Sequence, residues 1–236
     1  MKNDLLKKSL DSLGIKYDED QIEKFDLFYD LLTDWNKRMN LTAITEYDDV
    51  VIKHFVDSIL ICKFEDLKDK KIIDIGTGAG FPGIPLKIIN PSCEILLLDS
   101  LNKRIVFLEE VVRELGLKNV RLIHGRAEDL AHKEDFREVF DYAVSRAVSN
   151  LSTLSEYCIP FIKTGGFFIS YKSEGSDEEI EKARNAIKIL GSKIRDIKEY
   201  PLPYSDIKRK FVVIEKLEKV KNKYPRKAGV PVKDPL

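Results

Sequence analysis

A glycine-rich loop after a short apolar run constrains the fold of this chain more than any other feature. The run KIIDI, residues 71–75, leads into GTGAGFPG, residues 76–83, which contains four glycines. Glycine allows a tight turn and lets a ligand approach the backbone closely, because it has no Cβ. An apolar strand that ends in such a loop is typical of an open α/β sheet, in which ligands bind beyond the carboxyl ends of the strands.

The chain after residue 70 alternates between strand-like and helix-like segments. Five short apolar runs fit strands buried on both faces: 71–76, 93–99, 120–125, 140–147 and 165–172. Helices are predicted at 102–115, 151–162 and about 177–190. This alternation predicts βαβ units and therefore an α/β fold with a mostly parallel sheet. Two final strands, near 194–200 and 209–217, have no helix between them and should pair antiparallel.

The region before the glycine loop is predicted to be helical. Apolar residues recur at helical spacing between Phe25 and Trp35, which indicates an amphipathic helix that opens at an acidic cluster, residues 18–20. A second helix is expected from Glu46 to about Phe64. The tail contains three prolines and should be extended rather than helical. We divide the chain into a helical extension, an α/β domain and a basic tail: 1–64, 65–218 and 219–236.

Charge and cysteine content narrow the class of protein. The 40 basic and 40 acidic residues cancel, but residues 207–236 hold ten basic and three acidic side chains, a composition suited to a polyanion. The three cysteines form no C-x-x-C pair, which favours buried, reduced thiols over disulfides, and no metal site is indicated. Because no apolar run has the length of a signal peptide core or a membrane span, we expect a cytoplasmic protein without membrane contact.

The glycine loop fits two cofactor fingerprints. From Gly78 the letters satisfy G-x-G-x-x-G, the dinucleotide pattern, whereas from Asp74 they give D-x-G-x-G-x-G, as in methyltransferases that use S-adenosylmethionine. A pyrophosphate needs backbone N–H donors, and two prolines leave only three of them across residues 81–85, which favours S-adenosylmethionine. Asp74 is a candidate either for fixing the loop or for binding the amino acid part of the cofactor.

Three further positions at strand ends are candidate site residues. Asp99 ends the second strand and is placed to accept hydrogen bonds from ribose hydroxyls of either cofactor. Ala127 and Glu128 follow the third strand, where an adenine is expected, although a plain helix start explains them equally well. Arg146 ends the fourth strand and is a candidate catalytic residue, with a structural salt bridge as the alternative. The next residues contain no N-P-P-Y segment, and the chain has no Pro-Cys pair, so covalent attack on a cytosine is unsupported.

Seven segments, taken together and in order, resemble the bacterial glucose-inhibited division protein B family over about residues 35–236. They are NLTAIT, HFVDS, DIGTGAGFPGIPLKI, LLLDSLNKR, RAEDL, SRAV and YPRKAGVPVKDPL. The resemblance implies a class I S-adenosylmethionine-dependent methyltransferase with a seven-stranded, mostly parallel sheet and an antiparallel last strand. It also implies a substrate, N7 of a guanine in the decoding-region loop of 16S ribosomal RNA, free or in the small ribosomal subunit.

The resemblance also assigns roles to individual residues. It implies cofactor contacts for Gly76, Phe81, Asp99, Ala127, Glu128 and Arg146, and Asp74, Gly78 and Gly80 of the glycine loop complete the cofactor-binding set that we expect. The expected substrate-mouth residues are Asn40, Thr42, His54 and Asp57, although a lone histidine on an apolar helix face is more often a core residue. Because guanine N7 carries a lone pair and no proton, methylation requires no general base, and catalysis should come from positioning the reactants.

The basic tail and the last strand before it carry the expected RNA contacts. Arg209, Lys223, Arg226 and Lys227 are expected to neutralise phosphates, and Tyr224 to stack on a splayed base. A solvated charged tail without a ligand is the alternative. We expect a monomer, and we keep two other functions open: an NAD(P)-dependent oxidoreductase, and a noncatalytic RNA-binding protein on a methyltransferase scaffold.

Overall fold

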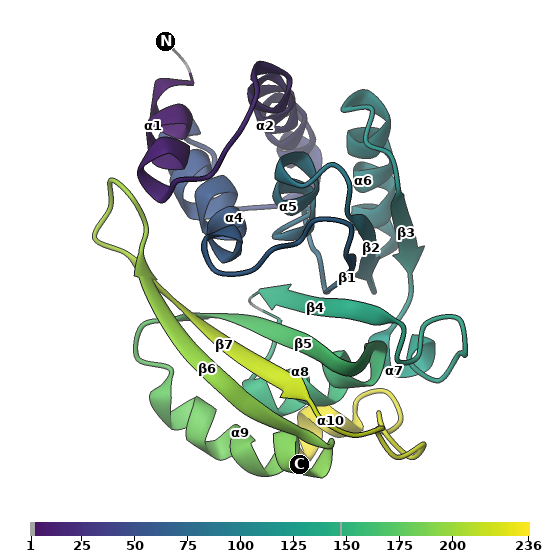
Figure 1. The fold of residues 1–236 in the computed structure, drawn as a ribbon. Coiled ribbons are helices and arrows are strands. Elements are labelled where there is room, and N and C mark those ends of the chain that lie inside the picture. Colours follow the sequence, from purple (N-terminus) through teal and green to yellow (C-terminus); the bar gives the residue numbers. More distant parts are fainter. Residues whose placement is uncertain (1–2, 147) are drawn as a thin grey trace.

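The computed structural model describes residues 3–146 and 148–236, and it has one seven-stranded sheet with helices on both faces (Figure 1). The strand order is β3-β2-β1-β4-β5-β7-β6. The first five strands pair in parallel: β1 (Lys71–Ile75), β2 (Glu94–Asp99), β3 (Val120–His124), β4 (Phe140–Arg146) and β5 (Ile162–Ser173). The last two, β6 (Ser192–Pro201) and β7 (Lys208–Lys216), pair antiparallel, as predicted. The expected α/β fold is confirmed, and residue 147, placed in the fourth strand above, lies outside the described residues.

The strand order reverses at β1, and this reversal positions the site. β1 pairs with β2 on one side and with β4 on the other, so that Asp74 lies beside Leu97 and Val144. After β2 the chain continues onto one face of the sheet, and after β4 it continues onto the other face. The carboxyl ends of these three strands therefore border a crevice. The glycine loop follows β1 at that edge.

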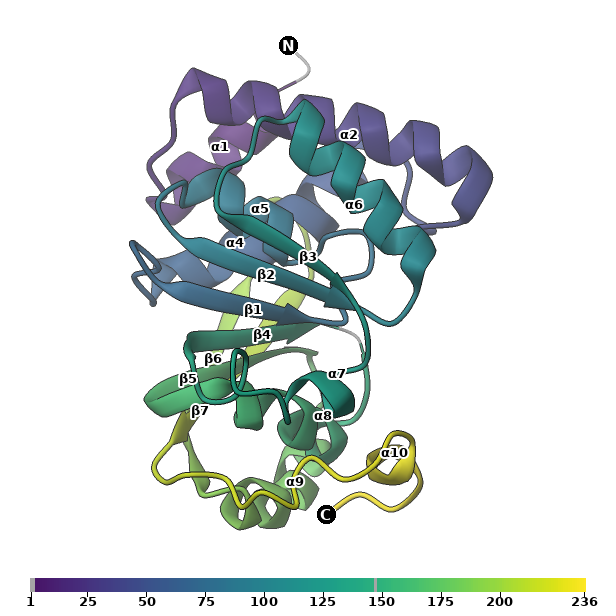
Figure 2. The same cartoon turned by 90° about the vertical axis from the view of Figure 1, so that its right-hand side faces the viewer.

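One face of the sheet is covered by α1 (Asp4–Leu13), α2 (Glu19–Met39), α5 (Gly83–Ile89) and α6 (Asn102–Glu114), together with the helical segment that contains α4 (Asp57–Ile59) (Figure 2). A capping box begins α2, in which the Asp18 side chain accepts from the Gln21 N–H and the Gln21 side chain accepts from the Asp18 N–H. The Gln21 side-chain amide also donates to the Ile88 carbonyl (2.8 Å), so the start of α2 is bonded to α5. The helix ends at Asn40, which has a left-handed conformation (φ 48°).

The helix predicted from Glu46 to about Phe64 runs over the range expected, but its middle is wider than an α-helix. It consists of α3 (Tyr47–Val50), a π-helical segment η1 (Val51–Val56), α4 (Asp57–Ile59) and a 3₁₀ segment η2 (Leu60–Lys63). The Asp57 N–H donates to the Ile52 carbonyl, five residues back. Widened segments of this kind are frequent at functional sites, and this one carries His54.

The other face carries α7 (Ala127–Leu130), α8 (Leu151–Cys158), η3 (Ile159–Phe161) and α9 (Asp177–Ile189). The tail also packs on this face, where Val220 and Tyr224 belong to the apolar core. The prediction of an extended tail was wrong at one place, because residues Val230–Lys233 form a short helix, α10. The prediction of buried cysteines was wrong for Cys62, which is half-buried, whereas Cys93 and Cys158 are buried and all three are free.

The helical extension shares one apolar core with the sheet. The core on its face of the sheet contains side chains from α1 and α2 together with side chains from β1, β2 and α5. The Phe28 ring lies 5.3 Å from the Phe81 ring of the glycine loop and 5.6 Å from the Phe55 ring, between centroids. Our division at residue 64 therefore describes the order of the chain, while the core is continuous across that point.

Gly83 is the glycine of the loop that depends most on close packing. A Cβ at this position would lie 2.3 Å from Leu97 Cδ2 and 2.8 Å from Asp74 Oδ2. We expect Gly83→Ala to lower the free energy of unfolding by about 1–3 kcal/mol, as overpacking does in a tight interior. Urea unfolding measures it. Gly125→Ala is the matched control, since a Cβ there meets atoms only at 3.9 Å, and equal losses in the two variants would contradict this interpretation.

Candidate functional site

Two adjoining hollows lie at the carboxyl ends of the strands, and they share Gly76, Asp99, Ser100 and Val148. The first, of about 270 Å³, is lined on its other sides by α7 and the tail, through residues that include Ala127, Glu128, Tyr157, Gly229 and Val232. The second, of about 430 Å³, is lined by residues that include Thr42, His54, Gly78, Phe81 and Arg146. Because the hollows share these residues, we treat them as one cleft with an α7 end and an Arg146 end.

Most backbone N–H groups of the glycine loop are already used within the protein. The N–H groups of Gly76 and Thr77 donate to the Leu98 carbonyl (2.9 and 3.1 Å), and that of Gly78 donates to Asp99 Oδ2 (2.9 Å). Further hydrogen bonds use the N–H groups of Gly80, Phe81, Gly83 and Ile84. A pyrophosphate needs such donors to point at the ligand. The loop is therefore poorly suited to a dinucleotide, for a reason broader than the two prolines.

Asp74 fixes the loop from beneath. Its side chain is fully buried, and Oδ2 accepts from the Thr77 hydroxyl (2.7 Å) and from the Gly83 N–H (2.9 Å). Burial raises the pKa of Asp74 to about 7. The residue does not line either hollow. Of the two roles considered for Asp74, these contacts correspond to the loop-fixing one.

Asp99 lies where both hollows meet. Its carboxylate is 2% exposed and accepts from the Gly78 N–H, from the Leu101 N–H (2.9 Å) and from Arg104 Nη1 (3.1 Å). Two backbone donors hold the carboxylate in place, while the Arg104 side chain is 37% exposed. Displacement of this arginine frees an acceptor for a ribose hydroxyl. Arg104 was missed as a site residue, although it belongs to the segment LLLDSLNKR that carried the family resemblance.

The α7 end of the cleft contains a buried carboxylate. Glu128 is 8% exposed, and it accepts from the Gly229 N–H of the tail (3.3 Å). Burial, together with the neighbouring Glu128 carboxylate, raises the pKa of Tyr157 to about 12, so this hydroxyl stays protonated. Ala127, the preceding residue, presents only a methyl group to the hollow. The small Ala127 side chain suits the flat face of an adenine, and the Glu128 carboxylate suits its amino group as a hydrogen-bond acceptor.

Arg146 is held by a carboxylate from the helical extension. Arg146 Nη1 donates to Asp57 Oδ2 (2.8 Å) and to the Lys53 carbonyl (3.2 Å), and its guanidinium lies 5.1 Å from the centre of the Phe81 ring. Asp57 is fully buried, and it also binds Arg209 through two hydrogen bonds (2.5 and 3.0 Å). Asp57 is thus an anchor beneath the cleft, and its predicted place at the substrate mouth was wrong.

His54 stands between Arg146 and the extension. Its ring stacks on the Phe81 ring, with centroids 4.5 Å apart, and its Nε2 lies 2.8 Å from Thr42 Oγ1. Burial and the charge of Arg146 lower the pKa of His54 to about 4, so the ring is neutral near pH 7. His54 Nδ1 lies 3.3 Å from the Arg146 Nη2 donor and 3.2 Å from the Lys53 carbonyl acceptor, so that both ring nitrogens have polar neighbours. Thr42 and His54 line the cleft, whereas Asn40 only ends α2.

The structure contradicts part of the expected RNA surface. Tyr224 is 6% exposed in the apolar core, so its ring is not available for stacking on a base. The Arg226 guanidinium is bonded to the fully buried Glu156 and to Asp234, and Arg209 is bonded to Asp57. Both arginines therefore form structural ion pairs within the protein. Lys223 and Lys227 are exposed, as RNA contact requires.

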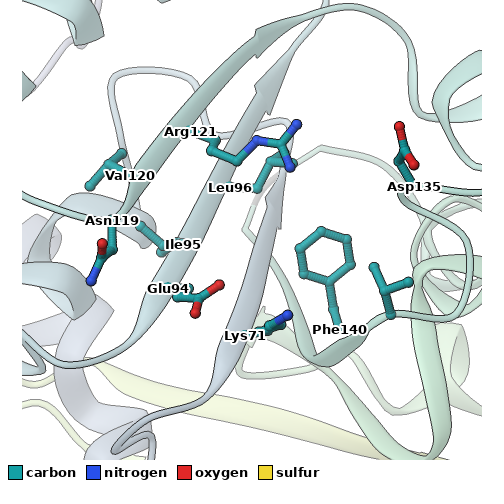
Figure 3. Close-up of a pocket in the computed structure, with 10 residues that line it drawn as sticks. Lys71, Glu94, Ile95, Leu96, Asn119, Val120, Arg121, Asp135 and Phe140 are labelled. Carbon is teal, nitrogen blue, oxygen red and sulfur yellow. The ribbon is translucent and has the colours of Figure 1, made fainter.

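Another hollow, of about 500 Å³, lies at the opposite edge of the sheet (Figure 3). Its lining includes the first residues of four strands, Lys71, Glu94, Val120 and Phe140. Ligands of open α/β sheets bind at the carboxyl ends of strands, so this hollow takes no part in the site. Within residues 3–146 and 148–236, no cluster of three potential metal ligands occurs, and no helix has the length and apolarity of a membrane span.

The sequence matches a known family over most of its length. The profile described as "GidB: rRNA small subunit methyltransferase G" matches residues 21–212. The chain belongs to this family. It is 51% identical over 234 residues to the ribosomal RNA small subunit methyltransferase G of Clostridium tetani, covering 99% of this chain and 98% of that protein. The protein of the same name from Alkaliphilus metalliredigens is 49% identical over 98% of both chains.

Solved structures agree on the fold. The M. jannaschii protein TYW2, solved in complex with AdoMet, superposes with a TM-score of 0.54 at 17% identity, over 65% of this chain and 72% of that one. A SAM-dependent methyltransferase from Aquifex aeolicus gives a TM-score of 0.53 at 17% identity, over 71% of this chain and 93% of that one.

Membership of the family confirms several predictions made from the sequence. The chain is a small-subunit rRNA methyltransferase, and its methyl donor is S-adenosylmethionine, as the loop and the resemblance indicated. The NAD(P)-dependent oxidoreductase was the wrong alternative. The lining of the cleft fits this cofactor, because the loop offers few free amides for phosphates and Asp99 offers an acceptor for a ribose.

The neutral state of His54 predicts a pH dependence of stability. An unfolded histidine has a pKa of about 6.5, whereas burial and Arg146 lower the pKa of folded His54 to about 4. As the pH falls from about 6.5 towards 4, His54 therefore binds a proton in the unfolded chain but not in the folded chain. The free energy of unfolding decreases over this pH range. We expect His54→Gln to reduce the loss by on the order of 1–3 kcal/mol, measured by urea unfolding at pH 7.5 and pH 4.5.

The control for this measurement is His124→Gln, since His124 lies on an exposed position of β3. It should leave the pH dependence as in the wild type. If His54→Gln and wild type lose the same free energy between the two pH values, His54 does not titrate as described.

Proposed function

We propose that this protein transfers a methyl group from S-adenosylmethionine to N7 of a guanine in the decoding-region loop of 16S rRNA. The observation that carries the proposal is the cleft at the carboxyl ends of the strands, with a ribose acceptor at its centre and a held arginine at one end. The family to which the chain belongs supports the RNA substrate. The choice of N7 rests on the resemblance described above and on the chemistry of the cleft.

The cofactor would lie along the whole cleft. Ala127 and Glu128 would contact the adenine, and Asp99 the ribose hydroxyls, after the Arg104 side chain has moved aside. Gly76 and Gly78, both with positive φ (71° and 61°), let the ligand approach the loop backbone. Gly80 acts at a distance from the ligand, because a Cβ there would meet Ile84 and Leu108. This placement directs the methionine part towards Arg146.

Arg146 would orient the reacting end of the cofactor. A guanidinium binds a carboxylate through charge-assisted hydrogen bonds, and Asp57 fixes the direction of this guanidinium from below. Phe81 supports it from the side, since its ring lies under both Arg146 and His54. We assign Arg146 to the methionine carboxylate, so that its catalytic contribution is positioning.

The target base would enter beside Thr42 and His54. S-adenosylmethionine supplies an activated methyl group, and guanine N7 attacks with a lone pair that carries no proton. No residue has to accept a proton in this step, which is consistent with a neutral His54 of low pKa. A neutral imidazole also adds no positive charge next to a base that becomes cationic. Thr42, which the Asn36 side chain holds by two hydrogen bonds to its backbone, provides a fixed hydroxyl at this wall.

RNA would bind on the side of the cleft where the tail lies. Lys223 and Lys227 are exposed cations there, and they support phosphate contacts. We further propose that the protein acts as a monomer in the cytoplasm, and that the chain functions as extension, catalytic domain and tail with the bounds given above.

A transfer experiment tests the proposed reaction. Purified protein is incubated with tritiated S-adenosylmethionine and 30S subunits from a strain that lacks this methyltransferase. We expect label in 16S rRNA and strand cleavage at one guanine after borohydride and aniline treatment, which detects N7-methylguanine. Parallel reactions with naked 16S rRNA and with assembly intermediates identify the preferred substrate. Absence of label in all three would contradict the proposed reaction.

Binding measurements on variants separate the cofactor half of the site from the RNA half. Asp99→Ala should weaken S-adenosylhomocysteine binding by about 1–3 kcal/mol, as expected for a lost partner of buried hydroxyls, with the exposed Asp129→Ala as control. The double variant Lys223→Ala, Lys227→Ala should keep its cofactor affinity and lose RNA affinity with a flatter salt dependence. Its control replaces Lys71 and Lys163, which are exposed at the opposite edge of the sheet. Equal effects of the two lysine pairs would contradict the assigned RNA surface.

A further inference from the structure

The C-terminal tail returns to the cofactor cleft. After β7 the chain crosses the face covered by α8 and α9, and α10 lies beside α8 in both views (Figures 1 and 2). Within the tail, Gly229 and Val232 line the α7 end of the cleft, together with Ala127 and Tyr157. The sequence predicted only RNA contacts for this tail. Its path assigns it a second place, at the cofactor.

Buried polar contacts fasten the tail on both sides of this point. The Arg137 guanidinium donates to the Tyr224 carbonyl (3.0 Å) and to the Val220 carbonyl (2.9 Å). Further along, the Thr153 hydroxyl donates to the Pro231 carbonyl (2.9 Å). Backbone carbonyls that are bonded in this way hold the main chain itself, independently of the tail side chains.

The strongest attachment is the ion pair between Arg226 and Glu156. Glu156 on α8 is fully buried, and it accepts from the Arg226 N–H (2.7 Å), from Nε (3.0 Å) and from Nη2 (2.8 Å). An unpaired buried carboxylate costs several kcal/mol. Release of the tail would leave Glu156 in that state, so the folded protein keeps Arg226 in place and Gly229 three residues further on.

The tail also touches a residue assigned to the adenine. The Gly229 N–H donates to Glu128 Oε1 (3.3 Å), which fixes one oxygen of a carboxylate that lines the cleft. Val232 is 56% exposed and presents an apolar side chain to the same hollow. An apolar surface next to Ala127 suits the flat face of an adenine, whereas a tail used only for RNA has no need of one.

We propose that the tail is part of the cofactor site. Val232 and Gly229 form the wall that contacts the adenosine of S-adenosylmethionine, and Arg226 is a positioning residue that seats this wall through Glu156. The identity of the ligand rests on the proposed function. The placement of the wall rests on the contacts described above.

A matched pair of variants tests the wall. Val232 and Val230 are both exposed residues of α10, but only Val232 lines the cleft. Val232→Asp removes an apolar contact and adds a charge next to Glu128, so we expect its dissociation constant for S-adenosylhomocysteine to rise by about tenfold or more. Val230→Asp, with the same change of charge in the same helix, should stay within about twofold of wild type. Calorimetry with the full chain, without RNA, measures both.

The outcomes separate this inference from the proposed function. Equal dissociation constants for the two valine variants overturn the proposal that Val232 contacts the cofactor, even if the wild type methylates 16S rRNA. A wild type that does not bind S-adenosylhomocysteine overturns the cofactor assignment and the wall together. Arg226→Ala tests the positioning role: its dissociation constant should rise as for Val232→Asp, while a control at another exposed tail cation, Lys219→Ala, stays at the wild-type value. Wild-type affinity in a folded Arg226→Ala protein, verified by circular dichroism, overturns that role.

Discussion

The fully buried carboxylate of Asp57 joins three separate parts of the chain. It lies in the helical extension and binds Arg146 at the end of β4 and Arg209 at the start of β7. A buried ion costs several kcal/mol unless its partners are well placed. The widened helix, the central strand and the antiparallel strand are therefore held in one mutual position. Arg146 reaches the cleft from this position. His54 contacts Arg146 directly, and Thr42 contacts His54 through a hydrogen bond, so these two residues are positioned with it.

The same physical device occurs at the other end of the cleft. Glu156 is fully buried on α8 and binds Arg226 of the tail, as Asp57 binds the arginines beneath the Arg146 end. Two elements outside the parallel sheet, the extension and the tail, are thus fixed by buried ion pairs and close the cleft from opposite sides. The proposed methylation of N7 needs no proton transfer, so its rate would depend on how well two reactants are held, and rigid walls meet this need.

Local patterns predicted the sheet and the loop, because apolar periodicity and glycine spacing act over a few residues. Asp99 and Ala127 were predicted at strand ends for that reason, and both line the cleft. The partners of buried charges were not predicted, because 152 residues separate Asp57 from Arg209 and 70 separate Glu156 from Arg226. The positive charge of Arg226 looked like an RNA contact, and Tyr224 looked like a stacking residue, because burial depends on tertiary packing that composition does not reveal.

The most direct test of this account measures the contribution of Asp57 to stability. Urea unfolding compares Asp57→Ala with Asp34→Ala, in which an exposed carboxylate loses its exposed partner Arg38. Loss of one member of a buried ion pair lowers the free energy of unfolding by about 3–5 kcal/mol, and we predict a loss of this size for Asp57→Ala. The exposed pair should contribute at most about 1 kcal/mol. Equal, small losses in both variants would contradict the claim that Asp57 holds the extension, the sheet and Arg146 together.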